Sequence, residues 1–112
     1  MSDKVCIIVS SGDSRVIKTA LQYARRTMTE SFMKDTKLFL FGPSEEIIAL
    51  DTELQDFVRM FMDETDKEVM ACKWCSDDYD VSEKLRELGI KVDFIGVYVS
   101  EAIREGYVPM VW

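Results

Sequence analysis

The 112-residue sequence contains no histidine. This absence excludes catalytic arrangements that pair a cysteine or a serine with an imidazole, and it excludes zinc sites of the H-E-x-x-H type. Any general base must therefore be a carboxylate, a lysine, a tyrosine or water. The absence of one residue type thus removes several common classes of hydrolase and metalloenzyme.

Cysteine is scarce as well, with only Cys6, Cys72 and Cys75 present. So few thiols in an intracellular chain argue against a disulfide framework and favour reactive or metal-binding cysteines. No apolar run approaches the length of a membrane span, and the N-terminal residues lack the hydrophobic segment of a signal peptide. We therefore expect a cytoplasmic protein with no membrane partner.

Basic residues are outnumbered, with 14 lysines and arginines against 21 aspartates and glutamates, which gives a net charge of -7. Such a surface repels phosphate backbones, so nucleic-acid binding is not expected. Hydrophobic residues make up 47% of the chain, which is ordinary for a globular protein. Together with the chain length, this indicates one domain over residues 1–112 with its own core.

Five short apolar runs predict β-strands, and the spacing of apolar residues between them predicts helices. The runs cover residues 4–10, 36–42, 69–72, 91–96 and 107–112. Alternation of strands and helices predicts a three-layer α/β/α fold on a mainly parallel five-stranded sheet with right-handed crossovers. Because Pro109 cannot donate a backbone hydrogen bond, the last strand is expected at an edge of the sheet.

The helix starts carry recognisable local signals. Pro43 suits the first turn of a helix whose macrodipole Glu45 would complement. Capping boxes are expected at two later starts, in residues 52–55 and residues 80–83. Residues 76–80 are expected to form a loop before the second of these helices.

The helix predicted after residue 52 has a wider apolar band than packing on one sheet requires. A deeply buried helix would explain this band, but the seven methionines of the chain favour a subunit interface, so a homo-oligomer is expected. The band consists of Leu54, Phe57, Val58, Met60, Phe61 and Met62.

The carboxyl ends of the predicted strands meet at one edge of the sheet, where open α/β folds bind ligands. Cys72 ends the third strand and is the strong nucleophile at a strand end, so we predict it to be the reacting group. The turn at residues 10–13 has neither the Walker pattern nor G-x-G-x-x-G, so no nucleotide cofactor is expected. The other residues expected around a pocket at this edge are Ser10, Ser11, Gly12, Asp13, Trp74, Gly96 and Tyr98.

The spacing Cys72-x-x-Cys75 is compatible with several roles. One is a dithiol in which one thiolate attacks and the other resolves, a motif that usually lies in the first turn of a helix. Another is half of a metal site, which Cys6 could not complete within one subunit because it lies inside a strand. A third is a single reacting thiol, Cys72, that carries sulfur as a persulfide. Finally, both residues could be ordinary loop cysteines.

The sequence resembles the DsrE/DsrF-like proteins, the group that includes TusD and other intracellular sulfur-relay components. The resemblance extends over essentially the whole chain. It is carried by VCIIVSSGD, TKLFLFG and VMAC at the first three strands, and by VSEKLRELGIKVDFIGVYVSEAIREGY in the C-terminal part.

The resemblance implies a three-layer fold, trimers or hexamers, and a sulfur-accepting cysteine at Cys72. That cysteine would take persulfide sulfur from a donor protein and pass it to an acceptor protein, a reaction that needs no histidine, metal or bound cofactor. Cys75 is not carried over from the family pattern, and it could form an internal disulfide. Two alternatives remain open: a dithiol redox protein that uses Cys72 and Cys75, and a non-catalytic binding module.

Overall fold

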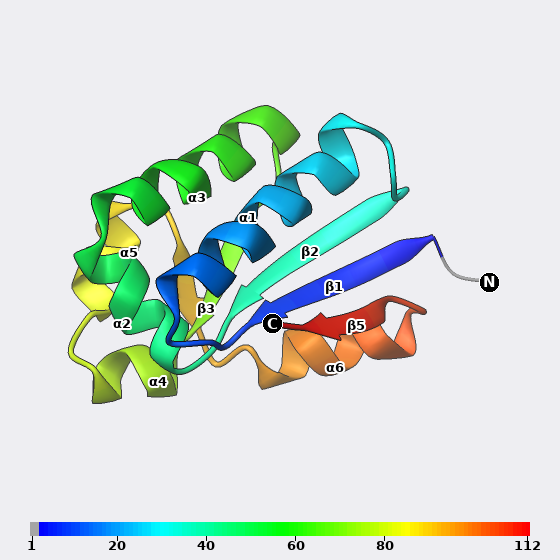
Figure 1. Cartoon of the computed structure of the whole chain (residues 1–112). Coiled ribbons are helices and arrows are strands. Elements are labelled where there is room, and N and C mark those ends of the chain that lie inside the picture. Colours follow the sequence, from blue (N-terminus) through cyan, green and yellow to red (C-terminus); the bar gives the residue numbers. More distant parts are fainter. Residues whose placement is uncertain (1–2) are drawn as a thin grey trace.

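The computed structural model describes residues 3–112, in which five strands form one sheet with every neighbouring pair parallel (Figure 1). The strand order is β4-β3-β2-β1-β5, which puts β5 and Pro109 at an edge, as predicted. The strands are β1 Lys4–Val9, β2 Asp35–Leu40, β3 Val69–Cys72, β4 Lys91–Asp93 and β5 Val108–Val111.

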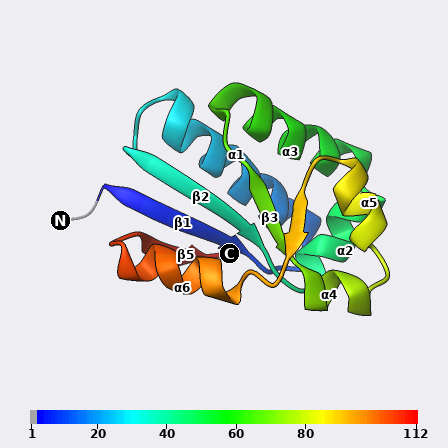
Figure 2. The same ribbon diagram turned by 180° about the vertical axis from the view of Figure 1, so that it is seen from behind.

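The helices lie on both faces of the sheet, which confirms the predicted three-layer fold (Figure 2). The chain steps from β1 to β4 in one direction, so right-handed crossovers put α1, α2, α3 and α5 on one face. The return from β4 to β5 runs the other way and puts α6 on the opposite face. Within residues 3–112, no helix is long and apolar enough to cross a membrane. The helices are α1 Ser14–Thr29, α2 Pro43–Leu50, α3 Thr52–Thr65, α4 Lys73–Asp78, α5 Ser82–Glu87 and α6 Gly96–Arg104.

The two faces of the sheet carry cores of different size. Side chains alternate along each strand, so Val5 and Ile7 join the larger core beneath α1 and α3. Cys6 points to the other face, where it packs with Phe39 and Met70 in a smaller core that α6 covers. Cys6 is fully buried, as its place within a strand predicts.

The wide apolar band of α3 is largely covered within the subunit, because α3 packs against α1. Leu54, Val58 and Phe61 are buried in the larger core, and Phe57 is partly buried against it. This packing accounts for most of the band that suggested a subunit interface. The expected homo-oligomer stays a prediction, and α3 alone is a weaker reason for it.

Both predicted capping boxes are wrong. At α3 the cap is Asp51, whose carboxylate accepts the Leu54 amide at 3.1 Å, while the Gln55 side chain donates backward to the carbonyls that end α2. At α5 the residue before the helix is Val81, and no side chain caps the start. Asp80 instead adopts a left-handed conformation with φ 57°, so its side chain does not serve as the cap.

Replacing Asp51 by alanine is expected to lower the free energy of unfolding by about 1 kcal/mol, because the Leu54 amide loses its capping acceptor. Thr52→Ala is the matched control. Thr52 is exposed and its side chain does not serve as the cap, so this change should cost less. Urea denaturation of the two variants measures the difference, and a greater loss in Thr52→Ala would contradict the assignment of the cap.

Candidate functional site

The two cysteines of the C-x-x-C motif lie at the start of a helix. The predicted loop over residues 76–80 is therefore wrong for residues 76–78, which belong to α4. Cys72 is the last residue of β3 and also the residue that precedes α4, which begins at once with Lys73. Residues three apart in a helical turn lie on the same side of the helix. The helix therefore brings Cys75 next to Cys72, which a loop would not have ensured.

Both thiols are free, and they contact each other. Cys72 is 9% exposed, and Cys75 is half-buried. Burial and the neighbouring Cys72 thiol raise the pKa of Cys75 to about 12, although the Gly42 amide partly opposes this. Cys75 therefore stays protonated at neutral pH beside the Cys72 sulfur.

A buried carboxyl group, Glu45, lies beside Cys75. Glu45 is in the first turn of α2, and its exposed fraction is 0%. Burial raises its pKa to about 8, while the Cys75 thiol and the Gly42 amide draw it down to a smaller extent. Neither carboxyl oxygen makes a hydrogen bond of ordinary geometry within the described chain, so we treat the approach of Cys75 as a contact, not as a bond.

Glu45 was not recognised as a site residue from the sequence, which assigned it only the role of complementing the macrodipole of its helix. The signal that could have found it is its spacing from Gly42. In a helix that begins after Gly42, a glutamate at the third position reaches back toward the amide at the helix start. That reach turns the side chain inward, toward the carboxyl ends of β2 and β3.

The turn at residues 10–13 is closed over by the end of the chain, so it does not form an open pocket with Cys72. The amides of Ser10 and Ser11 and the Ser10 hydroxyl all donate to the Trp112 carbonyl oxygen, at 2.9, 3.2 and 3.1 Å. Gly12 lies against α2, since a Cβ there would be 3.3 Å from Cβ of Pro43. Asp13 caps α1 by accepting the Arg15 amide at 2.8 Å.

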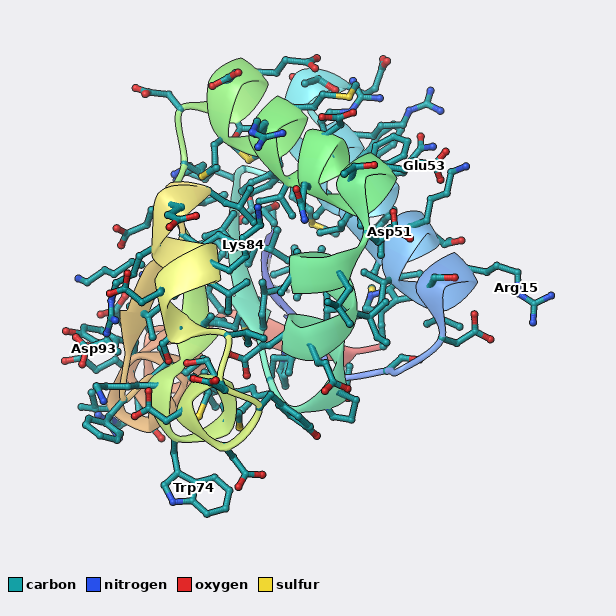
Figure 3. The ribbon with its side chains drawn as sticks, turned by 90° about the vertical axis from the view of Figure 1, so that its left-hand side faces the viewer. Arg15, Asp51, Glu53, Trp74, Lys84 and Asp93 are labelled. Carbon is teal, nitrogen blue, oxygen red and sulfur yellow. The ribbon has the colours of Figure 1, made fainter. Side chains whose placement is uncertain are left out.

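The remaining predicted pocket residues lie apart from one another. Trp74 is 70% exposed and projects from α4 away from the molecule (Figure 3). Gly96 is exposed at the first position of α6. Tyr98 lines a cavity of about 260 Å³ that also contacts Asp35 and Tyr107, near the amino ends of the strands, and the two thiols do not line it.

Cys6 does not join the two other thiols. It is fully buried in β1, and burial raises its pKa. Among residues 3–112, no three histidine, cysteine, aspartate or glutamate side chains lie together in a way that could hold a metal ion. The site is therefore a pair of thiols with one buried carboxyl group.

No protein-family model matches the chain, and no curated protein matches it. Among solved structures, the chain is similar to a conserved protein of unknown function, BT1422 from Bacteroides thetaiotaomicron. The TM-score is 0.87, and the alignment covers 98% of this chain and 95% of that chain with 23% sequence identity. At this identity the similarity establishes the fold alone, so the function must be inferred from the side chains of the site.

Proposed function

We propose that the protein is a sulfur carrier that accepts persulfide sulfur on Cys72 and passes it to a partner protein. The observation that carries the proposal is the position of Cys72, at the carboxyl end of β3, where its sulfur is in contact with a second thiol. Open α/β sheets place reacting groups at this edge. The resemblance to the DsrE/DsrF-like proteins, in which the matching cysteine accepts sulfur, supports the same assignment.

The reaction requires only thiol chemistry. In the loading step, the Cys72 thiolate attacks the outer sulfur of a donor persulfide, an S–S bond forms on Cys72, and the donor leaves as a thiolate. In the transfer step, an acceptor thiolate attacks the outer sulfur and Cys72 leaves as a thiolate. Atoms and charge balance in both steps, and neither step needs a histidine or a bound cofactor.

Exposed apolar side chains near Cys72 provide a surface for the donor and acceptor proteins. Trp74, Phe94 and Val97 are 70%, 59% and 56% exposed, and the Lys73 amine lies 5.5 Å from the Phe94 ring centre. Aromatic side chains of this kind are common at the centres of protein interfaces. We further propose a homo-oligomer, a trimer or hexamer, in the cytoplasm, where thiols stay reduced.

Dithiol–disulfide exchange is the second candidate function, and the helical placement of Cys72 and Cys75 favours it. In this reaction the Cys72 thiolate attacks a substrate disulfide and releases one thiolate. Cys75 then loses its proton and attacks the mixed disulfide, which releases the second thiolate and leaves an internal disulfide. The reaction begins with the same attacking thiol as sulfur transfer.

Intact-mass spectrometry after incubation with a persulfide donor tests the proposal. A sulfur carrier gains the mass of one sulfur atom, and a reductant removes it, because the sulfur is held by an S–S bond. A loss of two hydrogens at pH 7, with no species that carries an added sulfur atom, would instead assign the dithiol function. An unchanged mass would contradict both candidates and leave the non-catalytic binding module.

A further inference from the structure

Glu45 is a buried acid that the sulfur-transfer step does not use. Its side chain is fully buried, and both of its carboxyl oxygens lack an ordinary hydrogen bond within the described chain. Buried polar groups are nearly always satisfied, so an unpaired carboxyl group has a cost that calls for a functional reason. The side chain in contact with the Glu45 carboxyl group is the Cys75 thiol, which belongs to a different helix, α4.

The helices around Glu45 separate it and the two thiols from the charged side chains at the surface. Helices α1, α3, α4 and α5 pack against α2, and their charged side chains are exposed or half-buried. Lys84 on α5 is an example, exposed to solvent (Figure 3). On α2 itself, the neighbouring Glu46 is half-buried. The titratable groups that share the buried site with Glu45 are therefore Cys75 and, in contact with Cys75, Cys72.

We propose that Glu45 accepts the Cys75 proton when Cys75 attacks the Cys72 sulfur and displaces the group that Cys72 carries, and that it returns this proton when the internal disulfide is reduced. The inference rests on the proposed role of Cys72 as the thiol that attacks first. It extends that role, because it identifies Glu45 as the group that controls the reactivity of the second thiol, Cys75.

The step balances with the groups present. The Cys75 proton moves to the Glu45 carboxylate, the Cys75 sulfur bonds to the Cys72 sulfur, and the group that Cys72 carried leaves with the electrons of the broken bond. When Cys72 carries a persulfide, the leaving group is hydrosulfide. When Cys72 is joined to a substrate thiol, the leaving group is that thiolate.

The protonation of Glu45 thus decides whether Cys75 can react. With a pKa of about 8, Glu45 is mostly protonated at pH 7 and cannot accept a proton. Sulfur loaded on Cys72 is then retained for an acceptor. Above about pH 8 the carboxylate predominates, Cys75 is activated, and the carried group is expelled as the internal disulfide closes.

The reaction of the reduced protein with 5,5′-dithiobis(2-nitrobenzoic acid), an aromatic disulfide, separates the two steps. Attack by Cys72 releases one coloured thiolate, and attack by Cys75 on the mixed disulfide releases a second. We expect the rate of the second release to rise with pH and level off above about pH 8. In Glu45→Gln this release should be about 100-fold slower and lose that profile, while Glu45→Asp should restore part of it.

Glu46→Gln, which makes the same substitution one residue away, is the matched control and should keep the wild-type profile. Cys75→Ser should stop after one released thiolate. If Glu45→Gln keeps the wild-type second rate and pH profile, the inference about Glu45 is overturned while the role of Cys72 stands. If Cys72→Ser keeps the first release at the wild-type rate, the proposed role of Cys72 fails, and the inference fails with it.

Discussion

Replacement of Cys72 by serine is expected to abolish sulfur loading. The serine hydroxyl cannot form the S–S bond that holds the sulfur, and the remaining thiols are poor substitutes. Cys6 is fully buried in β1, and burial, the largest cause of the raised Cys75 pKa, persists when Cys72 is replaced. Intact-mass spectrometry after incubation with a persulfide donor should therefore show no added sulfur in Cys72→Ser.

Cys75→Ser is the matched control, because it removes a thiol from the same site and leaves Cys72 in place. It should gain one sulfur atom, and it should keep that sulfur longer than the wild type, since no second thiol can expel it as hydrosulfide. Loading of Cys72→Ser at the wild-type level would show that another thiol is the acceptor. Prompt loss of sulfur from Cys75→Ser at pH 9 would show that discharge does not require Cys75.

The fold could be predicted from the sequence because its signals are local and repeated. Each strand is a short apolar run, and Gly42–Pro43 marks the start of α2 clearly. The position of β5 at the sheet edge followed from Pro109, which cannot donate to a second neighbour. The helix starts at α3 and α5 were harder, because Asp51 and Thr52 are both good caps and only the backbone conformation decides between them.

The site was predictable only in part. Cys72 at the end of β3 followed from a run of four apolar residues, but the immediate start of α4 did not, because Lys73–Asp78 has no capping residue or apolar periodicity. Glu45 was missed because burial of a carboxyl group depends on the helices that pack around α2. Closure of the turn at Ser10 and Ser11 by Trp112 depends on contacts between residues about one hundred positions apart.

Replacement of Glu45 by glutamine is expected to stabilise the protein at alkaline pH. The pKa of Glu45 rises from 4.5 to about 8 on folding because the carboxyl group is buried, so the folded state binds the proton more tightly than the unfolded state. The free energy of unfolding should therefore fall as the pH rises from about 4.5 to about 8, and then level off. Glutamine carries no charge at any of these pH values and should remove this fall.

Urea denaturation at several pH values measures the effect. Between pH 4.5 and pH 9, the difference in the free energy of unfolding between Glu45→Gln and the wild type should change in favour of the variant by roughly 5 kcal/mol. Glu46→Gln should follow the wild-type curve, because Glu46 is only half-buried on the same helix. Parallel curves for wild type and Glu45→Gln across this range would mean that Glu45 ionises as readily in the folded protein as in the unfolded chain. Glu45 would then be a carboxylate at neutral pH, and its protonation could not keep Cys75 inactive there.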